Sequence, residues 1–388
     1  MKKFFVGALC AAALAAPASA QQASALNVHA GDVYTITMTD RQTLPGAAGA
    51  AAQAFTYNQI YRLDVLSDGA SDRRWRYTPI SIEVPSIASL VPQDRVSPTQ
   101  MAAMGEAFSA MMRIFADIGF ECRVDEHGRC LEMTNWPVWS ARTENVLLMF
   151  DAIMRIGTEE LRNHPKPDKQ AGAETPSTGP DLDWETYRGP VLQALATVLD
   201  GVDGRAAATS MATFHPMAEI QGRSLARGSS ERINEQWVMP FGAPPLTMTG
   251  TVTLQSVDAR TATFVRHATL DGASARASLQ SMIDFMINNV VTQMAPVLRQ
   301  RAGVDASPNA VRDLVRNIMG QVDISMEETT TGSVDLATGM ARHTSSDYVL
   351  RFRDRDGQHA PVTIRDHHEI TVAVGAPPTP RLPRGRGA

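Results

Sequence analysis

Apolar and polar positions alternate along the first part of the chain. Tyr34, Ile36 and Met38 share one parity, and the residues between them are threonines. The same two-residue period recurs over residues 57–65 and 75–84. Because successive side chains of a strand point to opposite faces, this pattern predicts an antiparallel meander of three strands with one apolar face.

A helical period follows the predicted strands. Ser97-Pro98 opens the segment, and proline is favoured in the first turn of a helix. Apolar residues then recur at three- and four-residue spacing as far as Ile118, which predicts an amphipathic helix. Its apolar face contains Met101, Met104, Phe108, Met111 and Phe115. A second helix is predicted over about residues 143–161.

The second half of the chain repeats this order. Alternating strands are predicted at residues 246–254 and 262–270, and a helix over about 274–299 has Met282 and Met286 on its apolar stripe. A hairpin then turns near residues 335–339, and the last strand covers 362–374. Internal duplication and chance similarity of two α+β segments both remain open explanations.

These elements predict an α+β fold in which curved antiparallel sheets are covered by long amphipathic helices. We expect an N-terminal half over residues 21–163 and a C-terminal half over 186–374. Residues 164–185, rich in Pro, Gly, Ser and Lys, form the predicted linker. The Pro- and Arg-rich tail over 375–388 has the composition of a disordered segment.

The N-terminus has the pattern of a signal peptide. Lys2 and Lys3 precede an apolar run, and Ala18-Ser19-Ala20 is a small-residue cleavage site. We expect cleavage after Ala20 and a periplasmic location, with secretion as the alternative. A transmembrane anchor would need a longer apolar run, and a lipoprotein would need a small residue in place of Leu9 before Cys10.

Composition narrows the class of partner. Without the signal peptide, 34 basic residues face 41 acidic ones, a net charge of -7. An acidic chain of this kind has no overall positive field for nucleic acid, so we expect no nucleic-acid partner. No later stretch of the sequence reaches 18 apolar residues, so no transmembrane segment is expected in the mature chain.

Cys122 and Cys130 flank an Asp-x-x-Gly turn and would lie close together in a hairpin. Exported proteins fold where disulfides persist, so we expect these two cysteines to be bonded. A metal site that includes His127 would lack a clear fourth ligand. Two free thiols are the remaining alternative.

Catalytic motifs are nearly absent from the sequence. Nucleophile elbows, zinc helices and phosphate or dinucleotide loops are all missing, and we expect neither a cofactor nor a metal. Asp366 and His368 share one face of the last predicted strand with apolar neighbours. An aspartate beside a histidine suits acid–base chemistry, but a structural hydrogen bond, or a place near an exposed sheet end, is the favoured explanation of the pair.

The predicted apolar helix faces suggest a ligand site instead. Methionine is flexible and polarizable, so it suits surfaces that adapt to varied apolar ligands. Helices that cross a curved sheet without filling it would line an apolar cavity. The candidate lining residues are Met101, Met104, Phe108, Met111, Phe115, Met282 and Met286. An ordinary hydrophobic core is the competing explanation.

Four features support a resemblance to known proteins: the signal peptide, the strand pair at residues 57–65 and 75–84, the Val124-Asp125-x-x-Gly128 turn and the 236–240 segment. With these features the chain resembles exported β-rich proteins of Gram-negative bacteria whose function is unknown. Its layout more distantly resembles half-barrel lipoprotein-carrier and lipid-binding families. That resemblance implies helices that close a curved antiparallel sheet around a hydrophobic ligand, but it assigns no residue.

We therefore expect a non-enzymatic periplasmic binding or carrier protein that holds a hydrophobic small molecule or lipid in an apolar cavity. The first alternative is an envelope interaction or assembly factor that binds another envelope protein through a sheet edge or the tail. The second is a hydrolase-type enzyme that uses Asp366 and His368.

Overall fold

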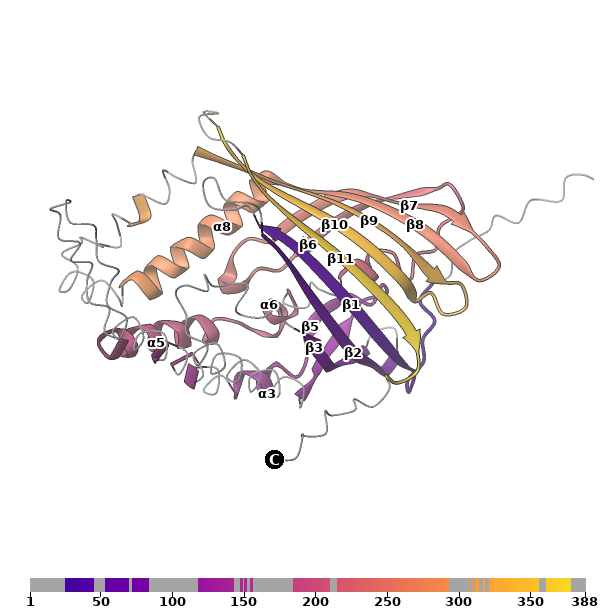
Figure 1. Ribbon diagram of the computed structural model, residues 1–388, viewed down its shortest axis with the longest axis horizontal. Helices are drawn as coiled ribbons and strands as arrows, with labels where there is room; N and C mark the ends of the chain where they lie inside the picture. The colour runs from indigo at the N-terminus through magenta and orange to yellow at the C-terminus, as the bar shows by residue number, and fades with distance from the viewer. Residues whose placement is uncertain are drawn as a thin grey trace, which may run out of the picture.

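Strands dominate the computed structural model of the protein (Figure 1). The structure describes residues 25–44, 53–69, 72–83, 118–142, 184–209, 215–292, 321–355 and 361–377, together with a few single positions within 147–155 and 307–317. The signal peptide, all of the helix predicted at 98–118 except Ile118, nearly all of the linker and the end of the tail lie outside the described residues.

A single antiparallel sheet contains all of the described strands. The first five strands are β1 (Val33–Leu44), β2 (Gln53–Gly69), β3 (Asp72–Glu83), β4 (Phe120–Val124) and β5 (Cys130–Met133). The next six are β6 (Ser230–Trp237), β7 (Leu246–Val257), β8 (Thr261–Leu270), β9 (Val322–Asp335), β10 (Ala341–Asp354) and β11 (Val362–Val374). The antiparallel architecture predicted from the alternation is confirmed.

The order of the strands joins the two halves of the chain. It runs β5-β4-β3-β2-β1-β11-β10-β9-β8-β7-β6, so each half is a meander that starts or ends at the centre of the sheet. The central pair is β1 and β11, with Met38 opposite Ile370. The sequence led us to expect several sheets, whereas the described strands of both halves share one.

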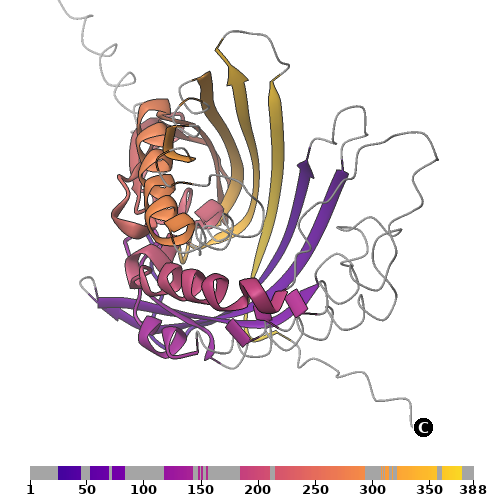
Figure 2. The same ribbon diagram turned by 90° about the vertical axis from the view of Figure 1, so that its left-hand side faces the viewer.

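Helices are few in the described part of the chain. Only α5 (Trp184–Asp200) and α8 (Gly272–Met286) have seven residues or more, so this part is mostly β rather than evenly α+β. Shorter elements are α3 (Trp136–Ser140), α6 (Gly204–Thr209), α7 (His215–Ala218), η2 (Pro240–Gly242) and η3 (Ile287–Val291). Figure 2 shows the sheet curving strongly, with α5 and α8 across its open side.

The helix predicted at residues 274–299 begins as expected. Asp271 caps α8 by accepting a hydrogen bond from the Ser274 backbone N–H, at 2.7 Å. Its buried residues are the small Ala275 and Ser278, while Met286 is 40% exposed. Small side chains bring the helix axis close to its neighbours, so the methionine stripe lies at the margin of this contact and not at its centre.

The predicted disulfide between Cys122 and Cys130 is confirmed. It links β4 to β5 across the turn at Asp125–Gly128, with a Cα–Cα distance of 5.3 Å. Gly128 has a φ of +76°, and a Cβ there would collide with Trp75 at 2.3 Å, so the turn requires glycine. The bond therefore closes a short loop at one end of the sheet.

Removing this disulfide is expected to lower the free energy of unfolding by about 2–3 kcal/mol, because the closed loop restricts the unfolded chain. The measurement is urea unfolding of the double variant Cys122→Ala/Cys130→Ala beside the native protein, with and without dithiothreitol. Reductant should destabilise the native protein and leave the variant unchanged. An equal response to reductant in both proteins would contradict the prediction.

Candidate functional site

The inner, concave face of the sheet changes character partway along its central strands. Near the β9–β10 turn it is apolar, with Met38, Ile370 and Phe264 fully buried. Two residues further along these strands, polar and charged side chains replace them. We call this region the polar belt, and it comprises Asp40, Asp366, His368, Ser346, Tyr348, Thr330, Glu328 and Arg266.

Strand register brings the belt together. Asp40 on β1 lies opposite His368 on β11, which lies opposite Ser346 on β10. Ser346 is paired in turn with Thr330 on β9, and Thr330 with Arg266 on β8. Residues directly opposite on paired strands point to the same face, so five strands contribute to one continuous row.

His368 is held between two carboxylates. Its Nδ1 donates to Asp40 Oδ1 at 2.5 Å, and its Nε2 lies 3.1 Å from Asp366 Oδ2. Burial alone would lower the pKa of His368, but the hydrogen bonds to Asp366 and Asp40 outweigh it and raise the pKa to about 9. At neutral pH this imidazole is therefore a fixed cation with both nitrogens engaged.

Gln59, Tyr61 and Tyr348 surround Asp40 and His368. Gln59 donates to Asp40 Oδ2 at 3.2 Å and accepts from the Tyr61 hydroxyl at 2.5 Å. The Tyr348 ring stands edge-on to the imidazole, with 5.2 Å between ring centroids. Burial, with Asp40 nearby, raises the pKa of Tyr61 to about 12, so its hydroxyl keeps its proton. These contacts fix the orientation of Asp40 and His368.

At the other end of the belt, Arg266 is completely buried among glutamates. Its terminal nitrogens each lie 3.2 Å from Glu235 on β6, and its Nε lies 3.0 Å from Glu328 on β9. Glu219, which directly follows α7, is 3.6 Å from Arg266 Nη1 and accepts from the Thr330 hydroxyl at 2.8 Å. One guanidinium thus connects two strands and the segment that follows α7.

Charge in this cluster is nearly balanced. Arg129 and Arg223 also approach Glu235, and together with Arg266 they lower its pKa although burial raises it. Burial and the neighbouring Glu219 raise the pKa of Glu328 well above its usual value, against the opposing effect of Arg266. These ion pairs connect the edge strand β6 to β8 and β9 of the same sheet, and we call this cluster a structural brace.

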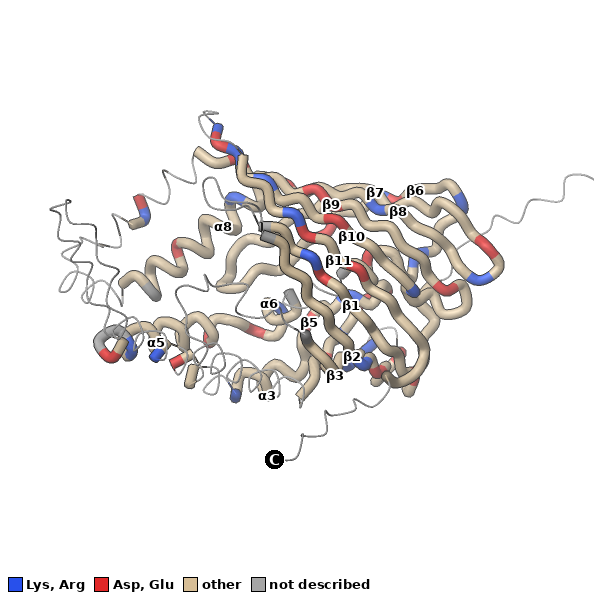
Figure 3. The backbone as a smooth tube through the Cα atoms, viewed as in Figure 1, with Lys and Arg blue, Asp and Glu red and all other residues tan. Residues whose placement is uncertain are grey.

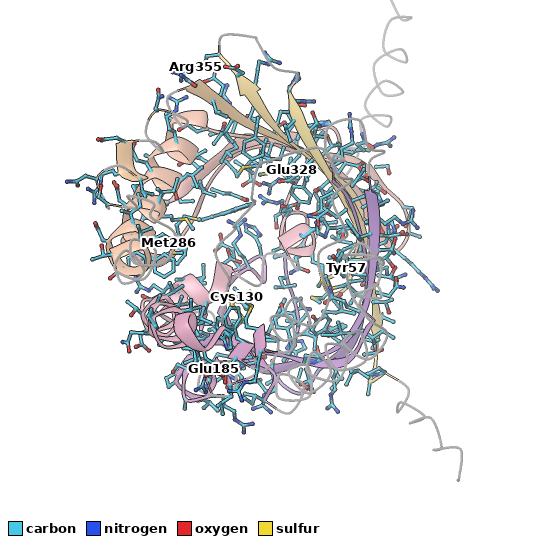
Figure 4. The ribbon with its side chains drawn as sticks, turned by 60° about the vertical axis from the view of Figure 1, so that its left-hand side comes forward. Tyr57, Cys130, Glu185, Met286, Glu328 and Arg355 are labelled. Carbon is cyan, nitrogen blue, oxygen red and sulfur yellow. A yellow bond between two sulfur atoms is a disulfide. The ribbon has the colours of Figure 1, made fainter. Side chains whose placement is uncertain are left out.

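Beyond the belt the inner face becomes apolar again, and these side chains are not fully buried. We call this region the apolar end, and it comprises Ile324, Met326, Leu350, Phe352, Val362 and Ile364. The residues pair across β9, β10 and β11, with Leu350 opposite both Met326 and Ile364. Val362 is 45% exposed. In Figure 4, Tyr57 and Glu328 lie on the sheet, facing Met286 on α8 and Glu185 on α5 across the open side.

The structure brings together one pair that the sequence singled out, Asp366 and His368. Met286 and the half-buried Met282 lie on α8, whereas the five candidates from Met101 to Phe115 lie outside the described residues. The sequence prediction missed Asp40 and Arg266. Both occupy inward positions of alternating strands, after Met38 and Phe264, so a charge at an apolar parity was the available signal.

Comparison of the chain with protein-family models and with curated proteins finds no match. No helix in the described part of the chain is both long and apolar enough to cross a membrane. Among those same residues, no group of three or more His, Cys, Asp or Glu side chains is arranged to hold a metal ion.

Proposed function

We propose that the protein is a non-enzymatic carrier or binding protein whose concave face holds a hydrophobic small molecule or lipid, in an exported compartment. The observation that supports this is the apolar end. Its six side chains point to the same face as the core, yet each keeps solvent exposure that the core residues lack. Apolar surface that lies together on a concave face is typical of ligand sites.

The polar belt supports a ligand with one polar and one apolar part. An amphiphile bound at the apolar end would have its polar group next to Asp366 and His368, the belt residues closest to Ile364 along β11. The Asp366 side chain is 27% exposed as a whole, and its Oδ1, which is buried, has no hydrogen-bond partner among the described residues. The belt would therefore limit how deeply the apolar part enters.

The same geometry argues against the hydrolase alternative. A general base needs a nitrogen that is free to accept a proton at working pH. Both ring nitrogens of His368 are hydrogen-bonded to carboxylates, and its pKa is raised to about 9. The triad therefore favours a fixed positive charge over proton transfer.

The proposal predicts saturable uptake of an uncharged apolar probe, N-phenyl-1-naphthylamine, with about one probe bound per chain. Leu350→Gln should weaken the binding about tenfold, because it places an amide among the apolar side chains of the site. Fluorescence titration measures the affinity. Val349→Gln is the matched control, since Val349 is the neighbouring residue on the opposite face of β10, and it should leave the affinity unchanged.

Native mass spectrometry of protein purified from the periplasm tests the same proposal without a probe. A bound mass that Leu350→Gln removes and Val349→Gln keeps would support a ligand on the concave face. A ligand-free native mass together with no saturable probe uptake would contradict the proposal. Unchanged thermal midpoints show that both variants are folded.

A further inference from the structure

The convex face of the sheet at the apolar end is rich in arginine. We call this group the arginine rim, and its strand members are Arg41, Arg351, Arg353, Arg365 and, just after β10, Arg355. Arg276 joins it from α8, where it pairs with Asp323 on β9. The described carboxylates on or beside it are Asp323, Glu327, Asp347 and Asp354, and Asp347 is hydrogen-bonded to His367 at 2.9 Å. Arg351 pairs with Glu327 at 2.8 Å, while Asp323 is shared between Arg276 at 3.1 Å and Arg355 at 2.9 Å. Among the described residues, positive charge therefore exceeds negative charge here, on a chain whose total charge is -5.

Arg41 and Arg365 have the clearest positions in the rim. Both are exposed, and neither forms an ion pair within the described part of the chain. Arg41 lies opposite His367 on β11, so Arg365 is its diagonal neighbour, about 7–8 Å away in a regular sheet. Two like charges at this spacing repel each other, and an anion placed over them would relieve that repulsion.

Strand alternation separates the charges of this region between the two faces. Asp40 directly precedes Arg41 and Asp366 directly follows Arg365 in the chain, and both aspartates point inward to His368. Figure 3 shows blue and red adjoining along the tube of β1 and β11 for this reason. The outer face at these positions therefore presents guanidinium groups, while the carboxylates next to them in sequence are engaged inside.

Arginines and apolar side chains occur at the same end of the sheet. Val362, 45% exposed, lies opposite Phe352 on the inner face, and Arg351 and Arg353 flank Phe352 on the outer face. This combination suits the surface of a bilayer, where guanidinium groups meet lipid phosphates and apolar side chains enter the interface. An acidic protein would match the arginines but would give no role to the exposed apolar residues.

We propose that the arginine rim docks this end of the protein on a membrane surface that contains anionic phospholipid. The docking goes beyond ligand binding, since membrane attachment needs no bound ligand. It would place the apolar end beside the bilayer, from which a hydrophobic ligand is exchanged. The negative charge of the whole chain opposes this contact, so binding depends on the local excess of arginine and weakens with salt.

The test is flotation of the purified protein with vesicles of phosphatidylcholine alone or with 30% phosphatidylglycerol, at low and high salt. We expect binding only with phosphatidylglycerol and release by salt. Arg41→Glu/Arg365→Glu should lower the partition coefficient at least tenfold. The control Arg232→Glu/Arg260→Glu changes two exposed arginines on β6 and in the β7–β8 turn, away from the rim, and should bind as the native protein does.

Two further comparisons complete the test. A chain ending at residue 377 lacks the three tail arginines, and its binding should show the same dependence on Arg41 and Arg365. Probe uptake by the rim variant should stay unchanged, which separates this proposal from the proposed ligand function. Equal binding to both vesicle types, equal loss in the control variant, or binding to poly-glutamate in place of vesicles would overturn the proposal.

Discussion

Replacing Arg266 by methionine is expected to lower the free energy of unfolding by about 3–5 kcal/mol, or to prevent folding at 37 °C. The guanidinium is fully buried and is the centre of contacts to Glu235, Glu328 and Glu219. Without it, the buried Glu219 and Glu328 lose the guanidinium beside them, whereas Glu235 keeps Arg129 and Arg223. An uncompensated buried charge is among the costliest single changes in a protein.

A compensated variant shows whether the charge or the packing is responsible. Adding Glu219→Gln and Glu328→Gln to Arg266→Met removes the carboxylates that face the lost guanidinium and should recover a large part of the lost stability. Urea unfolding followed by circular dichroism measures each variant. Arg232→Met, a change of the same type at an exposed position on β6, should stay within about 0.5 kcal/mol of the native protein. If Arg266→Met costs no more than this control, the buried arginine is not a structural brace.

The stability of the protein is expected to fall as pH rises from about 6.5 to about 9, because of His368. Its pKa is about 9 in the folded chain, against a usual value of 6.5. The folded state therefore binds this proton more tightly than the unfolded state does. The resulting stabilisation is complete below pH 6.5 and is lost as pH rises through 9. It amounts to about 3 kcal/mol at 1.36 kcal/mol per pKa unit.

Urea unfolding at pH 6.5, 8 and 9.5 measures this dependence. His368→Gln should be less stable than the native protein at pH 6.5, and the difference between the two should shrink towards pH 9.5. His343→Gln is the matched control, since His343 is an exposed histidine that faces Glu369 at 3.3 Å on the outer side of the sheet. It should keep the pH dependence of the native protein, and a parallel pH dependence in His368→Gln would contradict the assignment.

Local pattern was enough to predict much of the sheet. A two-residue period identified the core strands β1 and β2, and the Asp-x-x-Gly signal located the hairpin that the disulfide closes. The same period correctly placed Asp366 and His368 on one face. In contrast, β6 was not predicted. Glu235 occupies an inward position of this strand and interrupts the apolar alternation, and the structure shows that Arg266 balances its charge.

Local sequence pattern could not identify contacts between residues that are distant in the sequence. Asp40 and His368 are 328 residues apart, and they meet only because β1 pairs with β11. No turn signal connects those two strands, so nothing near either residue indicates the other. The continuity of one sheet across both halves rests on the same pairing, which explains why separate sheets were expected from the sequence.

The pairing of β1 with β11 also sets the order in which the molecule can be completed. Of the described strands, β1 is synthesised first and β11 last, so β1 cannot form this pair until β11 has been made. At the end of the pair, Gly375 donates its backbone N–H to the Val33 carbonyl at 2.8 Å. Until then β1 has a free backbone edge, which invites pairing with other chains. Contacts of such long sequence separation fold slowly. An interruption of synthesis anywhere before residue 362 therefore leaves the centre of the sheet, and not its margin, open to aggregation.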